Sequence, residues 1–67
     1  MEQTDWKFTM TNHAGEARFE LLDNDTNTPY GTVIRRGDRF HAQHDRAGDQ
    51  GSFDTVEDAF TAIDDAN

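Results

Sequence analysis

Cysteine is absent from this sequence. Its absence excludes a disulfide framework and a thiolate zinc site, so the chain must fold by packing alone. No apolar run approaches the roughly 20 residues that a helix needs to cross a bilayer. The N-terminus is polar and acidic, where a signal peptide would carry positive charge. We therefore expect a cytoplasmic protein without a membrane segment, folded as a single domain over residues 1–67.

Positive charge is also scarce. Six Lys and Arg residues face fourteen Asp and Glu residues, which leaves a net charge of −8. Residues 1–29 carry two bases and six acids, residues 30–48 four bases and two acids, and residues 49–67 six acids without a base. The acidic charge is thus concentrated towards both ends of the chain and is interrupted by a basic segment.

Aromatic residues, by contrast, are frequent enough to form one core. Apolar residues fall on alternate positions in Trp6–Met10 and again in Ala17–Leu21, which is the period of a strand with one buried face. Asn12–Gly15 between them has turn composition, so the two segments should pair as a hairpin. The polar stretch Asp23–Pro29 is a predicted loop.

A second hairpin is predicted from Tyr30–Arg35 and Arg39–His44, joined by the tight-turn sequence at residues 36–38. Asp45–Gly51 reads as another polar loop, with a short strand end at Ser52–Phe53. Together these segments predict an antiparallel sheet of four or five strands.

The chain then changes period to that of a helix over about Val56–Asp65, with Thr55 at the N-cap position. The apolar side chains gather on one arc of the helix: Val56, Ala59, Phe60, Ile63 and Ala66. We therefore predict an α+β fold, in which one C-terminal helix packs on one face of the antiparallel sheet.

Two segments, Gly31–Ala42 and Gly51–Ala59, resemble the three-strand-plus-helix modules of the plant ethylene-response DNA-binding domain and the integrase arm-binding domain. The shared pattern is a Gly-led basic strand, a strand with an aromatic residue followed by Ala, and a Gly-x-Phe-Asp-Thr-x-Glu-x-Ala entry into the helix. The resemblance covers about half of the chain. It implies that the sheet enters a DNA major groove through Arg35, Arg36 and Arg39.

The acidic residues favour a different function. Five carboxylates lie on the polar side of the predicted helix: Asp54, Glu57, Asp58, Asp64 and Asp65. Their average spacing is close to the roughly 3.4 Å that separates phosphates along a DNA strand. A second acidic row is offered by Glu16, Glu20, Asp23 and Asp25. In size and charge the chain is similar to small acidic phage-type inhibitors of the anti-CRISPR or anti-restriction kind, which mimic DNA.

The first hypothesis is therefore a non-enzymatic interaction protein that mimics nucleic acid and blocks the basic surface of a DNA- or RNA-binding protein or complex. The alternative is a salt-adapted domain of haloarchaeal type, because Asp strongly exceeds Glu and Lys occurs once. Direct nucleic-acid binding through the Arg35–Arg39 hairpin ranks third, since acidic segments flank it and phosphate binding requires a basic footprint.

No enzyme, metal site or cofactor is predicted from these residues. His41 and His44 are three apart on a predicted strand, which points them to opposite faces rather than to one metal, and we expect both on the surface. Ser52 has no adjacent base or nucleophile elbow. The oligomeric state stays open, because an exposed sheet edge can pair two copies into a homodimer.

Overall fold

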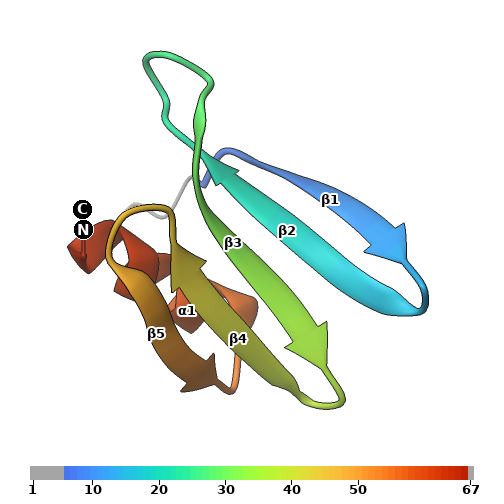
Figure 1. Cartoon of the computed structure of the whole chain (residues 1–67). Coiled ribbons are helices and arrows are strands. Elements are labelled where there is room, and N and C mark those ends of the chain that lie inside the picture. The colour runs from blue at the N-terminus through green and yellow to red at the C-terminus, as the bar shows by residue number, and fades with distance from the viewer. Residues whose placement is uncertain (1–5, 67) are drawn as a thin grey trace.

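The computed structural model describes residues 6–66, which form one five-stranded antiparallel sheet and one helix (Figure 1). The strands lie in chain order across the sheet, and each neighbouring pair is antiparallel. The elements are β1 (Phe8–His13), β2 (Glu16–Leu22), β3 (Pro29–Arg36), β4 (Arg39–His44), β5 (Gly48–Phe53) and α1 (Val56–Asp65). The predicted α+β class and the C-terminal helix are confirmed.

The turn of the first hairpin is tighter than the sequence suggested. Asn12 and His13 belong to β1 and pair with Ala17 and Glu16, so only two residues connect the strands. Ala14 and Gly15 both have positive φ, at 54° and 82°. Two residues with positive φ give the turn the twist that matches the flanking strands. The first strand also begins at Phe8 rather than at Trp6.

The largest local difference is β5, because most of the predicted loop Asp45–Gly51 is strand. The turn is confined to residues 45–47, and β5 then pairs with β4 from Gly48 onwards. Its register shifts opposite Ala42 and Gln43, and Gly51 has a φ of 96°. Gly-rich, polar β5 has little intrinsic strand propensity, so its pairing with β4 makes it a strand.

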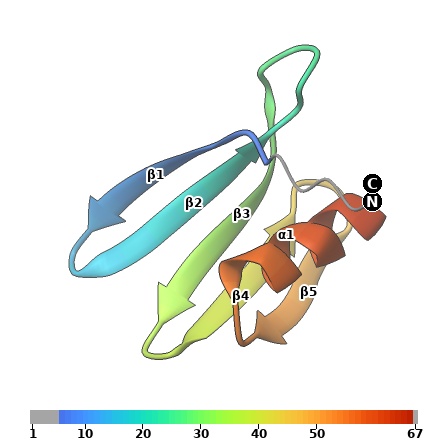
Figure 2. The same ribbon diagram turned by 180° about the vertical axis from the view of Figure 1, so that it is seen from behind.

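Helix α1 packs its apolar arc against the sheet. Thr55 is the N-cap, and its hydroxyl accepts a hydrogen bond from the Asp58 N–H at 3.1 Å. The buried core joins helix and sheet and consists of Leu21, Val33, Ala42, Ala59, Phe60 and Ile63. Figure 2 shows α1 over β3, β4 and β5, so the first hairpin extends beyond the part of the sheet that the helix covers.

The two faces of the sheet differ in chemistry. Side chains alternate along each strand, so Phe19 and Leu21 of β2 lie on the helix side with Val33 and Ala42. The other side, which we call the open face, carries mostly polar and charged residues. Within residues 6–66, no helix is long and apolar enough to cross a membrane.

Candidate functional site

Of the five predicted carboxylates, Glu57, Asp58, Asp64 and Asp65 belong to α1 and lie on the side of the helix that faces away from the sheet. We call these four the carboxylate row. Asp54 precedes the N-cap Thr55 and pairs instead with Arg39 of β4, so it is not part of the row. All five residues are exposed. At about 100° per residue, the side chains of the four row residues fall within an arc of about 120° around the helix axis, with Thr61 among them. The row therefore forms one continuous acidic surface over the length of the helix.

Few partners offset the charge of this row. Asp64 accepts a hydrogen bond from the Tyr30 hydroxyl. Among residues 6–66, no ion pair involves Glu57, Asp58 or Asp65. The last turn of α1 holds no basic residue, although the helix dipole disfavours carboxylates there. Asp64 and Asp65 therefore do not serve the stability of the helix.

The open face of the sheet is balanced in charge. Four acids and four bases lie on it or at its rim: Glu16, Glu20, Asp49, Asp54, Lys7, Arg18, Arg36 and Arg39. Glu16 and Arg36 approach to 3.9 Å. Because the carboxylate row has four acids and no base of its own, the two sides of the molecule differ strongly in charge.

The second predicted acidic row does not lie beside the helix as a unit. Leu21 is buried under α1, so its neighbour Glu20 points to the open face, and Glu16 shares that face. Asp23 and Asp25 lie in the loop between β2 and β3. There Asp23 Oδ1 accepts hydrogen bonds from the Asp25 N–H at 2.8 Å and the Thr26 N–H at 3.3 Å, which shapes the turn.

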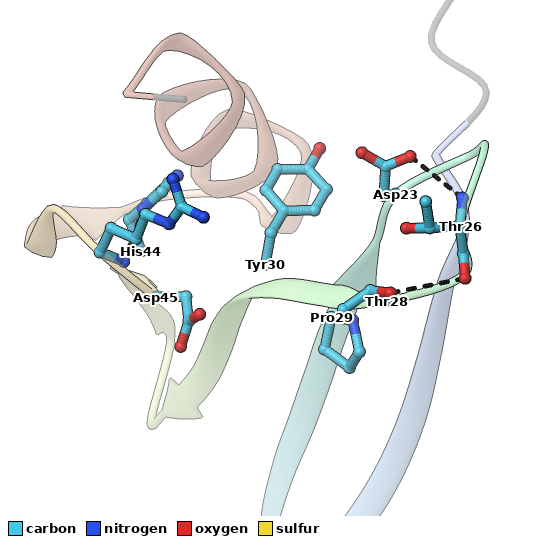
Figure 3. A pocket seen from close by; sticks show the side chains of 8 residues that line it. Asp23, Thr26, Thr28, Pro29, Tyr30, His44 and Asp45 are labelled. Atoms are coloured by element: carbon cyan, nitrogen blue, oxygen red, sulfur yellow. Dashed lines mark hydrogen bonds between the residues drawn. The ribbon is translucent and has the colours of Figure 1, made fainter.

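An open pocket of about 280 Å³ lies at this end of the sheet (Figure 3). The β2–β3 loop and the turn after β4 form its sides, and Tyr30 stands between them. The lining residues are Asp23, Thr26, Thr28, Pro29, Tyr30, His44, Asp45 and Arg46. Through Tyr30, which bonds Asp64, the pocket adjoins the C-terminal end of the carboxylate row.

Tyr30 makes the stability of the folded protein depend on pH. Its hydroxyl donates to Asp64 Oδ1 at 3.3 Å, and burial, followed by the charges of Asp64 and Asp23, raises the pKa of its phenol. A raised pKa means that the folded state holds the proton more tightly than the unfolded chain does. The resulting stabilisation is complete below the unfolded-state pKa and is lost as the pH rises through the folded-state pKa.

We therefore expect the free energy of unfolding to fall as the pH is raised past the normal titration range of tyrosine. The Tyr30→Phe variant should lack this component of the pH dependence. Because Tyr30 is the one tyrosine of the chain, phenolate absorbance in the folded and urea-unfolded protein reports its two pKa values directly. Equal midpoints in the two states would contradict the expectation.

His44 is buried, at 6% exposure, which corrects the expectation that both histidines lie on the surface. Its Nδ1 accepts hydrogen bonds from the backbone N–H groups of Arg46 and Ala47, at 3.0 and 3.1 Å. Nε2 has no partner among residues 6–66. His41 lies on the open face, 3.1 Å from Asp49, so the two histidines do point to opposite sides as predicted. His44 holds the β4–β5 turn in place.

The basic hairpin does not present its three arginines together. Arg35 lies on the helix side of β3 and donates from Nε to the Gly37 carbonyl at 3.0 Å. Arg36 and Arg39 lie on the open face, where each is paired with an acid, Glu16 and Asp54 respectively. The positive charge available to a phosphate backbone is therefore largely offset within the molecule.

No known protein family matches the sequence, and neither curated proteins nor solved structures include one with significant similarity to it. The functional argument therefore rests on the geometry and charge of this chain.

Sequence reasoning missed two residues of this region, Tyr30 and His44. Tyr30 was assigned only to a strand, and nothing in its neighbourhood pointed to Asp64, which lies 34 positions later in the chain. For His44 a signal did exist. His44 is two positions after Ala42 in the same predicted strand, and residues two positions apart in a strand lie on the same face. Because Ala42 was a predicted core residue, His44 could have been placed on the core face.

Proposed function

We propose that the protein is a non-enzymatic interaction domain that places its carboxylate row on a basic surface of a nucleic-acid-binding protein and thereby occupies the place of a nucleic acid. The observation that carries this proposal is the separation of charge between the two sides of the molecule. The open face carries bases among its acids, whereas Glu57, Asp58 and Asp65 are exposed on a helix without a base and have no ion pair among residues 6–66.

The mechanism is electrostatic and needs no chemical step. Carboxylates spread over about 12 Å of helix, at about 1.5 Å per residue, can pair with Arg and Lys side chains that otherwise hold phosphates. Such complementarity accelerates association and weakens as salt screens the charges. The cost of placing Asp64 and Asp65 at the negative end of the helix dipole, about 0.3–1 kcal/mol each at low salt, indicates that something other than helix stability retains them.

The test removes the charge of the row without changing its shape. The fourfold variant Glu57→Gln, Asp58→Asn, Asp64→Asn, Asp65→Asn is compared with wild type as bait in cell extracts. We expect wild type to capture DNA- or RNA-binding proteins that short duplex DNA then elutes, and the variant to lose this capture. For one purified captured protein, affinity should fall at least about tenfold, which corresponds to about 1.4 kcal/mol.

A matched control separates the row from overall charge. The variant Glu16→Gln, Glu20→Gln, Asp38→Asn, Asp45→Asn removes the same four charges from the open face and the turns. It should retain binding close to that of wild type. An equal loss of binding in both variants, or captured proteins that duplex DNA does not displace, would contradict the proposal.

One observation favours salt adaptation as a second candidate. Exposed carboxylates are not confined to the helix but also occupy the turns, at Asp25, Asp38 and Asp45. A salt-adapted domain needs molar salt to offset the repulsion among these charges. Unfolding midpoints in low and in molar salt distinguish the two hypotheses. An interaction domain should be folded in both salt conditions, whereas a salt-adapted domain should be folded only in molar salt.

A further inference from the structure

Strand β1 carries the two large apolar side chains that are most exposed among residues 6–66. Phe8 is 43% exposed and Met10 is 63% exposed. Both lie on the helix side of the sheet, where Phe8 reaches Phe19 and Phe60 at ring-centre distances of 6.0 and 5.1 Å. Met10 lies further along β1, whereas the sheet contacts of α1 are mainly with β3, β4 and β5.

The two edges of the sheet are protected to different degrees. At the β5 edge the register shifts, Gly48 and Gly51 have φ values of 86° and 96°, and Asp49 adds a charge. Bulges, irregular backbone and charge are the usual means of preventing strand pairing at an edge. At the β1 edge, the sequence Phe-Thr-Met-Thr-Asn-His contains no Lys, Arg, Asp, Glu or Pro, and its register with β2 is regular. This edge is open to a further strand.

The hydrogen bonds between β1 and β2 show which backbone groups are available at this edge. The Leu22 N–H donates to the Lys7 carbonyl at 2.8 Å, so Lys7 and Leu22 form a hydrogen-bonded pair. Such pairs alternate along an antiparallel ladder, and Thr9 and Thr11 therefore bond inwards as well. The N–H and C=O groups of Phe8, Met10 and Asn12 point outwards, away from β2.

We propose that two copies of the protein pair through β1 to form a homodimer with a continuous sheet across the interface. The strands run antiparallel about a twofold axis, with Met10 opposite Met10 of the second copy. This register places Phe8 opposite Asn12 of the second copy and joins all three outward-pointing residues in hydrogen-bonded pairs. The exposed Phe8 and Met10 then become diagonal cross-strand neighbours on the same face of the shared sheet.

The symmetry of the pairing favours a second copy over an unrelated strand, and charge restricts where two copies can meet. With a net charge of −8, two copies repel each other over most of their surface, and β1 is an uncharged strand at an open edge. The proposed register also makes Thr9 face Thr11 of the second copy, a favourable cross-strand pair. The pairing closes on itself, because the remaining edges are the two protected β5 strands, so it yields a dimer rather than a fibre.

Sedimentation equilibrium of the full chain over a range of concentrations, in low and molar salt, measures the assembly. We expect a species of twice the chain mass of 7.6 kDa, favoured by salt because salt screens the repulsion. Amide hydrogen exchange supplies a residue-specific readout. Phe8, Met10 and Asn12 should exchange slowly only in the dimer, while Thr9 and Thr11, which bond to β2, should be protected in both states.

Two substitutions at one position test the contact. Met10→Pro removes an N–H that points away from β2, which an edge strand tolerates, and should abolish the dimer. Met10→Lys keeps the backbone, places a charge in the contact and should weaken dimerisation at least about tenfold. Thr61→Lys makes the same change of charge on the exposed side of α1 and should leave the dimer intact. Circular dichroism verifies that each variant is folded.

Several results would overturn the proposal. One is a wild-type chain that stays monomeric in molar salt at the highest concentration reached. Another is a dimer that survives both Met10 substitutions, which would locate the contact elsewhere. A third is slow exchange of Phe8, Met10 and Asn12 in a monomer at every concentration, which would assign the edge to another segment of the same chain.

Discussion

Replacing Phe60 with alanine should lower the free energy of unfolding by about 4 kcal/mol, in the range that buried aromatic truncations cost. Phe60 is 1% exposed. Its ring centre lies 5.7 Å from that of Trp6, 5.1 Å from Phe8 and 6.3 Å from Phe19. Through Phe8 and Phe19 it connects α1 to the first hairpin. Its loss therefore opens a cavity between two parts of the core.

A cost of this size approaches the whole stability expected of a 67-residue domain, about 0.05–0.15 kcal/mol per residue. Urea unfolding followed by circular dichroism measures the effect. Phe60→Leu keeps much of the apolar volume and is the matched comparison, with an expected loss about half as large. A Phe60→Ala protein that unfolds at nearly the wild-type urea concentration would show that the ring does not hold the helix on the sheet.

The core containing Phe60 was largely predictable from the sequence, because the alternation of strands and the helical period both mark which residues are buried. Alternation located Phe19 and Leu21 on one face of a strand, and the helical period located Ala59, Phe60 and Ile63 on one arc. The helix limits were also predicted correctly, since Thr55 is the N-cap and the helix spans Val56–Asp65. Local signals were sufficient for these elements.

Strand β5 was not predictable in the same way. Its sequence, Gly-Asp-Gln-Gly-Ser-Phe, contains two glycines and has the composition of a loop. The strand exists because β4 offers it hydrogen-bonding partners, and its backbone accommodates the register shift through positive φ at Gly48 and Gly51. Propensity is a weak guide where the neighbouring strand determines the conformation.

The candidate site likewise contains residues that local sequence patterns predict and contacts that they do not. The carboxylate row follows from the helical period, so its four members could be named from the sequence. Asp54 was wrongly placed with them, because it precedes the N-cap and the helical period does not apply to it. The orientation of Glu20 was also available, because a residue next to the core residue Leu21 must point to the opposite face. Contacts between distant segments had no such signal. The bond from Tyr30 to Asp64 depends on how closely α1 approaches β3, which no local pattern specifies.

That close approach requires glycine at position 31, so Gly31→Ala should destabilise the protein by about 2 kcal/mol, a typical cost of overpacking a core. A Cβ atom at this position would overlap Ile63 Cγ2 and would lie 3.0 Å from Ile63 Cδ1 and 3.2 Å from the Gln43 carbonyl oxygen. Gly31 is not among the glycines with positive φ. The expected loss is therefore steric, and it opposes the usual gain of about 0.4–1 kcal/mol from replacing glycine by alanine.

A double-mutant cycle with Ile63→Ala isolates this contact. Ile63→Ala alone should cost about 2–5 kcal/mol through lost burial, but it removes both methyl groups that a Cβ at position 31 would meet. Gly31→Ala should therefore cost much less in the Ile63→Ala background than in wild type, which appears as a coupling energy of about 1 kcal/mol or more. Additive effects of the two substitutions would show that Ile63 does not set the distance between α1 and β3. Because α1 carries the carboxylate row, a coupled result also means that Gly31 fixes where that row stands above the sheet.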